Sequence, residues 1–225
     1  MTSAPDRRTE IADDPARRAL VRRALRLEAA ALAWLAIEAG VATWSGIMAA
    51  SVSLSAFGFD SVIELASAGV LMWRLDRELR RGATVAEGAE RLARRLAGGL
   101  LLVLAAYILI AAGGKLAAGE GQAFSWSGLG IAAASMPVMY LLARRKIAVA
   151  DALKSRALRA DAAESLTCIW LSLVVVGGLA IQRLTGAWWV DAVTSLGILW
   201  FVVREGIEAW HDEDEDAESD DRDLA

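Results

Sequence analysis

The chain has 225 residues, of which 56% are hydrophobic, and its mean hydropathy is +0.40. This hydropathy excludes a typical soluble domain and is typical of an integral membrane protein, and the long Ala, Leu and Val runs with only three prolines favour helices over a barrel of strands. The net charge of −4 comes from an acidic block near the C-terminus, so the rest of the chain is net basic.

Six apolar segments are long enough to cross a bilayer, which takes about 20 residues. In chain order they cover residues 27–48, 50–73, 96–117, 125–143, 162–183 and 187–206. The first two are joined by the uncharged stretch "SGIMAAS", which predicts a helical hairpin. The sequence therefore predicts an all-α membrane protein with six transmembrane helices.

Polar segments flank this apolar region and suggest three parts. Residues 1–26 are Arg-rich and lack the apolar core of a signal peptide, so they are predicted to be a basic cytoplasmic segment. Residues 27–208 form the six-helix transmembrane domain. Residues 209–225 are predicted to be an acidic, disordered cytoplasmic tail.

The basic residues indicate the orientation. All but two of the 24 Lys and Arg residues lie before the first span, at or after the end of the sixth, or in the links between the second and third and between the fourth and fifth. Only Lys115 and Arg183 lie on the other side. Because basic residues collect on the cytoplasmic side, both termini are predicted to be cytoplasmic, with the protein in a bacterial cytoplasmic (inner) membrane.

Four residues in two spans are the strongest candidates for a binding site. Asp60 and Glu64 lie four residues apart in "GFDSVIELAS", and Glu164 and Cys168 lie four apart in "RADAAESLTC". Residues four apart share a helix face, so two facing helices would offer three carboxylates and one thiol. Such acids are costly in a bilayer unless a cation or protons neutralise them. The pattern predicts a divalent-cation site, with Zn²⁺ favoured by the thiolate, Mn²⁺ or Fe²⁺ as alternatives, and release coupled to protonation.

Three residues near this site have two interpretations each. Glu38, in the first span, is either a supporting ligand or a proton relay. Asp161 is either a ligand or a carboxylate that favours the N-terminus of its helix. Cys168 is either a ligand or a small buried residue that only packs.

The acidic stretch "HDEDED" is either a solvated tail or a weak cation-binding segment, and the other charged residues are assigned structural roles. Asp191 is expected to favour the N-terminus of the sixth span, and Glu28 and Glu205 are expected to be interfacial. P-loop, HExxH and GxSxG motifs are absent and the one histidine, His211, lies in the tail, so the chain is not predicted to be an enzyme. The basic clusters are topology signals, and no nucleic acid is expected as a partner.

These motifs resemble the cation diffusion facilitator (cation efflux) family over residues 27–208. The stretch "SVSLSAFGFDSVIELASA" resembles the family's second-span motif, with Asp60 and Glu64 at its ligand positions. The stretch "ALKSRALRADAAESLTCIWLSLVVVGG" resembles the approach to span five, with Glu164 and Cys168 at the other two positions. The departures are Glu in place of the second Asp of span two, and Glu and Cys in place of His or Asp followed by Asp on span five.

The resemblance implies a divalent metal cation transporter, which exports Zn²⁺ or a related ion in exchange for protons by alternating access. It also implies a homodimer in the lipid bilayer, with spans one, two, four and five forming a bundle around the site. The family's cytoplasmic C-terminal domain is expected to be absent, as in a short branch of the family. The alternative is a membrane sensor or scaffold that binds a cation structurally and moves none.

Overall fold

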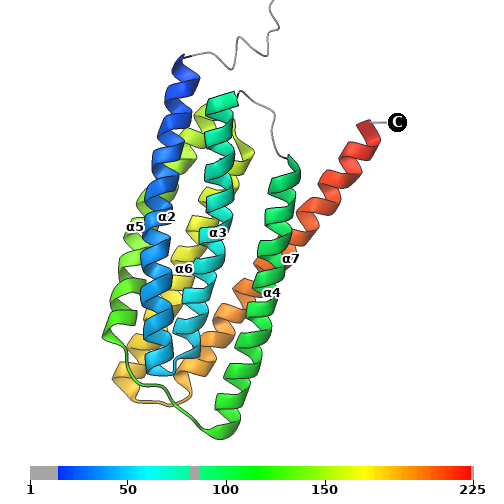
Figure 1. Ribbon diagram of the computed structural model, residues 1–225. Coiled ribbons are helices and arrows are strands. Elements are labelled where there is room, and N and C mark those ends of the chain that lie inside the picture. Colours follow the sequence, from blue (N-terminus) through cyan, green and yellow to red (C-terminus); the bar gives the residue numbers. More distant parts are fainter. Residues whose placement is uncertain (1–14, 82–86, 224–225) are drawn as a thin grey trace, which may run out of the picture.

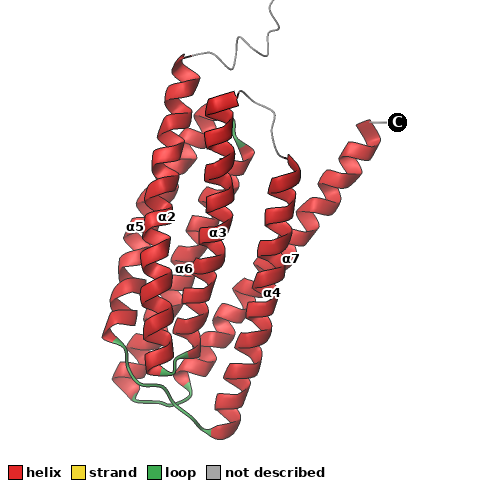
Figure 2. Ribbon diagram, in the orientation of Figure 1, coloured by secondary structure: helices red, strands yellow, loops and turns green. Residues whose placement is uncertain are grey.

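The protein is a set of long helices joined by short links, and no strand occurs within residues 15–81 and 87–223, which the computed structural model describes (Figure 1, Figure 2). Residues 1–14, 82–86 and 224–225 lie outside this description, including most of the predicted basic N-terminal segment. The helices are α2 (Pro15–Ala49), α3 (Val52–Arg81), α4 (Glu87–Ala118), α5 (Trp126–Leu153), α6 (Arg156–Thr185) and α7 (Val190–Asp223). The predicted all-α fold with six membrane-domain helices is confirmed.

Within the described residues, five of the helices, α2 to α6, are long and apolar enough to cross a membrane. Helix α7 is as long as these, but its second half is acidic. Large apolar side chains lie open on the outside of the helices, among them Trp44, Ile110 and Leu184, the last 86% exposed. Such a surface suits contact with lipid rather than water. The chain is an integral, multi-pass membrane protein.

The helices are longer than the apolar spans that the sequence predicts. A hydropathy window detects only the apolar part of a helix, whereas Ala, Arg, Leu and Glu outside it are strong helix formers. Helix α7 illustrates the difference: it continues through the acidic segment to Asp223, which was expected to be disordered, and its last part projects beyond the other helices (Figure 1).

Helices α2, α3, α5 and α6 pack on one another as a four-helix bundle, as the resemblance implied. Helices α4 and α7 form a second group, which contacts the bundle through α3 and α6. The first residue of α2 and the last of α7 lie at the same end of the molecule, here called the termini side (Figure 1). The short links 50–51, 119–125 and 186–189 lie at the opposite end, here called the loop side.

The link between α2 and α3 is only two residues long, and Ala50 adopts a positive φ of 51° there. The two helices of this hairpin pack closely enough for their backbones to be in contact. A Cβ added at Gly58 would lie 2.5 Å from the Thr43 nitrogen, and one at Gly46 would lie 2.5 Å from the Ser55 nitrogen. Only glycine fits these two positions, so the register of α2 against α3 is fixed beside the acidic pair of α3.

Asp191, in the first turn of α7, caps the N-terminus of α3. Its carboxylate accepts hydrogen bonds from the Val52 nitrogen at 2.8 Å and from the Ser53 nitrogen at 3.1 Å. The hydroxyls of Ser51 and Ser53 also donate to it, at 2.8 and 2.6 Å. Lys115 of α4 lies 3.6 Å from the same carboxylate. The predicted place of Asp191 in the first turn of its own helix is confirmed, and the residue also joins α7 and α4 to α3 at the loop side.

Candidate functional site

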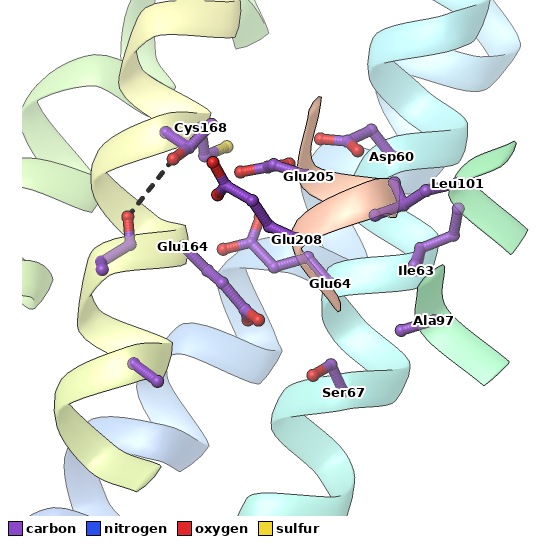
Figure 3. Close-up of a pocket in the computed structure, with 13 residues that line it drawn as sticks. Asp60, Ile63, Glu64, Ser67, Ala97, Leu101, Glu164, Cys168, Glu205 and Glu208 are labelled. Carbon is purple, nitrogen blue, oxygen red and sulfur yellow. Dashed lines mark hydrogen bonds between the residues drawn. The ribbon is translucent and has the colours of Figure 1, made fainter. Parts of the chain in front are cut away.

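A cavity of about 300 Å³ lies where the four-helix bundle meets α4 and α7 (Figure 3). Its polar lining consists mainly of acids from three helices: Asp60 and Glu64 from α3, Glu164 from α6, and Glu205 and Glu208 from α7. Ser67, Thr167 and Cys168 complete the polar lining, and the apolar lining comes from Ile63, Ala97, Leu101, Ala160 and Ala163. All four sequence-predicted site residues therefore line one cavity.

The two predicted pairs run in opposite directions along the cavity. Helix α3 runs toward the termini side, so Asp60 lies further from that side than Glu64. Helix α6 runs away from it, so Cys168 lies further in than Glu164. Ala160, close to the start of α6, also lines the cavity, which therefore extends inward from the termini side to Asp60 and Cys168.

Asp60 is the most deeply buried of the lining carboxylates, with 7% of its surface exposed. No hydrogen bond or ion pair reaches its side chain from the residues that the structure describes. The charged residues that line the cavity with it are all acids, namely Glu64, Glu164, Glu205 and Glu208. A buried carboxylate that is surrounded by other acids needs a cation or a proton to compensate its charge.

The acids line the cavity without converging on one point. Across residues 15–81 and 87–223, no three His, Cys, Asp or Glu side chains form a group that could hold a metal ion in this conformation. Their carboxylates repel one another, which favours such a spread arrangement. The chemistry of the set, several carboxylate oxygens and one sulfur, is that of a divalent-cation site.

Glu38 lies behind the cavity wall, inside the four-helix bundle, and is fully buried. Its carboxylate accepts hydrogen bonds from a side chain of each bundle helix: Trp34 at 2.9 Å, Ser61 at 2.7 Å, Ser135, and the thiol of Cys168 at 3.5 Å. Because both oxygens are already engaged and Glu38 does not line the cavity, its contact with the site runs through Cys168.

Asp161 also lies outside the cavity lining, in an ion-pair cluster on the termini side. Its carboxylate pairs with Lys146 of α5, which is 1% exposed and also contacts Glu28 of α2 at 3.1 Å. The N-terminus of α6 is capped by Ser155 instead, which accepts a hydrogen bond from the Leu158 nitrogen. Asp161 thus joins helices α2, α5 and α6 rather than capping its own.

Two positions differ from the sequence prediction. Glu28 and Glu205 were expected to be interfacial, but Glu28 is fully buried and Glu205 lines the cavity. The spacing within α7 alone could not identify Glu205, because its relation to α3 depends on how α7 packs in three dimensions. Glu28 could have been identified only through Lys146, because a buried Lys requires acidic partners.

Comparisons with known proteins agree with this architecture. Residues 29–210 match the family described as the cation efflux transmembrane domain. The chain is also 29% identical over 199 residues to a protein of Synechocystis sp. (strain ATCC 27184 / PCC 6803 / Kazusa) named "Uncharacterized transporter sll1263". That alignment covers 82% of this chain and 62% of the relative, so the chain spans less than two thirds of the relative's length. The match over residues 29–210 includes α3 to α6 and parts of α2 and α7, and the chain belongs to the cation efflux family.

Proposed function

We propose that the protein is a divalent metal cation transporter, with Zn²⁺ as its first substrate and Mn²⁺ or Fe²⁺ as alternatives. Membership of the cation efflux family and a relative named as a transporter support transport rather than catalysis. The observation that carries the proposal is the cavity itself, which Asp60, Glu64, Glu164 and Cys168 all line. A thiol beside carboxylates favours Zn²⁺ over the harder Mn²⁺.

Transport would be coupled to protons. When no ion is bound, the repelling acids of the cavity gain from protonation, and an arriving cation displaces those protons. Glu38 contacts this site only through Cys168, whose thiol donates a hydrogen bond to it from the cavity wall. Export of the cation would then be driven by protons that move in the opposite direction.

Alternating access follows from the two helix groups. The bundle of α2, α3, α5 and α6 and the pair α4 and α7 meet at the cavity, so movement between the groups would open it to one side and then the other. Both termini lie in the cytoplasm by the distribution of basic residues, which makes the termini side the cytoplasmic side. Gly113 and Gly114 of α4 have open space around them in the single chain and leave a face for close packing in a homodimer.

Zinc uptake into proteoliposomes tests the transport proposal. Wild-type protein should carry Zn²⁺ across the bilayer, and Asp60→Ala should reduce the rate to that of protein-free vesicles. Asp151→Ala is the matched control, because Asp151 is an exposed acid paired with Arg159 away from the cavity lining. If the wild type binds Zn²⁺ yet moves none, the protein is a cation-binding sensor or scaffold instead.

A further inference from the structure

We propose that Glu205 of α7 is a further cation ligand, which acts together with Asp60 of α3. The inference rests on the proposed function, since it extends the cation site by one residue from a third helix. Glu205 lines the same cavity as the four predicted residues and is directed into it from α7 (Figure 3).

Asp60 is the observation that points to a ligand at this position. It is more than nine-tenths buried, it lines the cavity, and within the described part of the chain no donor reaches it. Asp60 and Glu205 are carboxylates that line one cavity, where like charges repel each other. A divalent cation between Asp60 and Glu205 would convert this repulsion into two attractive contacts.

Glu205 is also held in place from α6. The side chain of Thr167, another lining residue, hydrogen-bonds with the Glu205 carboxylate. A carboxylate can accept several hydrogen bonds or bind an ion with its remaining lone pairs, so this bond orients Glu205 without occupying it fully. Positioning of a ligand by such a neighbour is usual in metal sites.

The packing of α7 fixes its register against the other helices. At the loop side, Asp191 caps α3 through the first residues of that helix. Next to Glu205, the buried Gly206 packs on α4, where an added Cβ would lie 3.1 Å from a methyl carbon of Leu102. Helix α7 therefore meets α4 through Gly206 while Glu205, its neighbour in the sequence, lines the cavity.

Glu208 differs from Glu205 although both line the cavity. Its side chain is 56% exposed and lies 2.7 Å from Arg204, which already compensates its charge. Removal of the Glu208 carboxylate should therefore weaken cation binding only slightly. The two residues form a matched pair, one turn apart on the same helix, for testing the assignment.

A ligand on α7 has a mechanical consequence. The acids of α3, α6 and α7 do not converge on one point in this conformation, so an ion that gathered ligands from all three helices would draw α7 toward α3 and α6. Because α4 packs on α7, it would follow. Cation binding would thereby move one helix group against the other.

Zinc binding to the full chain in lipid nanodiscs tests this assignment, with Zn²⁺ alone as the probe and competition with a zinc-sensitive dye as the readout. Glu205→Gln should weaken Zn²⁺ affinity about tenfold, the typical loss for one charged contact, while Glu208→Gln should change it less than about twofold. Equal effects of the two variants would overturn the assignment. If Glu205→Gln does not yield folded protein, the comparison becomes Glu205→Asp against Glu208→Asp, with the larger loss expected at 205.

Thermal unfolding separates a ligand from a structural residue. Because Glu205→Gln removes a repelling charge and keeps an acceptor for Thr167, it should not lower the unfolding temperature of the metal-free protein, and it should reduce the rise that Zn²⁺ causes. A lower unfolding temperature with unchanged Zn²⁺ affinity would contradict the assignment. Asp60→Asn serves as the reference variant. If Asp60→Asn weakens Zn²⁺ binding and Glu205→Gln does not, only the assignment of Glu205 is wrong. If the wild-type protein does not bind Zn²⁺, the proposed function is wrong as well.

Discussion

The thiol of Cys168 donates a hydrogen bond to the carboxylate of Glu38, with sulfur and oxygen 3.5 Å apart. Cys168 lines the cavity, whereas Glu38 lies inside the four-helix bundle and accepts further hydrogen bonds from α2, α3 and α5. Any change at Cys168, such as loss of its proton to a bound metal, therefore alters the hydrogen bonding at the centre of the bundle.

Replacement of Glu38 should destabilise the bundle. Glu38→Ala removes the carboxylate acceptor of Trp34 and Ser135, whereas Ser61 keeps the Phe57 carbonyl oxygen, and each buried donor left unsatisfied costs about 1–3 kcal/mol. Glu38→Gln keeps one acceptor oxygen and should cost less. The measurement is the free energy of unfolding in detergent, with the exposed Glu120→Ala as the control that should change little.

Removal of the Cys168 sulfur should change metal preference more than overall transport. Cys168→Ser keeps a small polar side chain but replaces a soft ligand with a hard one, which favours Mn²⁺ relative to Zn²⁺. We expect the ratio of Zn²⁺ to Mn²⁺ uptake to fall about tenfold, equivalent to the loss of one good ligand. The same ratio in wild type and Cys168→Ser would mean that the thiol only packs against Glu38.

The ion-pair cluster of Lys146, Glu28 and Asp161 should be essential for stability. Lys146→Met leaves two buried carboxylates without a cation, a change that typically costs about 3–5 kcal/mol. Arg159→Met breaks only the exposed pair with Asp151 and should cost about 0–1 kcal/mol.

Chemical unfolding of both variants measures this difference. Addition of Glu28→Gln and Asp161→Asn to Lys146→Met should restore part of the stability, because it removes the uncompensated charges. If Lys146→Met is as stable as wild type, the cluster contributes nothing to folding.

The contact of Gly58 with Thr43 should tolerate no side chain. A Cβ at Gly58 would lie 2.4 Å from the Thr43 hydroxyl oxygen, so Gly58→Ala forces α2 and α3 apart and should cost about 1–3 kcal/mol. Gly40→Ala, on α2 with nothing within 4 Å of the new carbon, should leave stability unchanged or raise it. Thermal unfolding of the two variants side by side distinguishes them.

The sequence predicted the helices because hydropathy and helix propensity are local properties. It also predicted that Asp60, Glu64, Glu164 and Cys168 would share one site, and they line one cavity, because a spacing of four puts each pair on one face of its helix. It could not identify Glu205, nor the pairing of Glu28 with Lys146, because these depend on which helices become neighbours. It placed Asp191 correctly at the start of α7 but could not predict that Asp191 also caps α3, because that contact depends on tertiary packing.

Zinc flux driven by an imposed pH gradient tests the central claim most directly. Proteoliposomes with an acidic interior should accumulate Zn²⁺ through the wild type while a pH dye in the lumen reports proton loss, and collapse of the gradient should stop both. Asp60→Asn should show neither flux, and Asp151→Asn should match the wild type. Zinc accumulation that is unaffected by the pH gradient, or equal in wild type and Asp60→Asn, would contradict proton-coupled transport through this cavity.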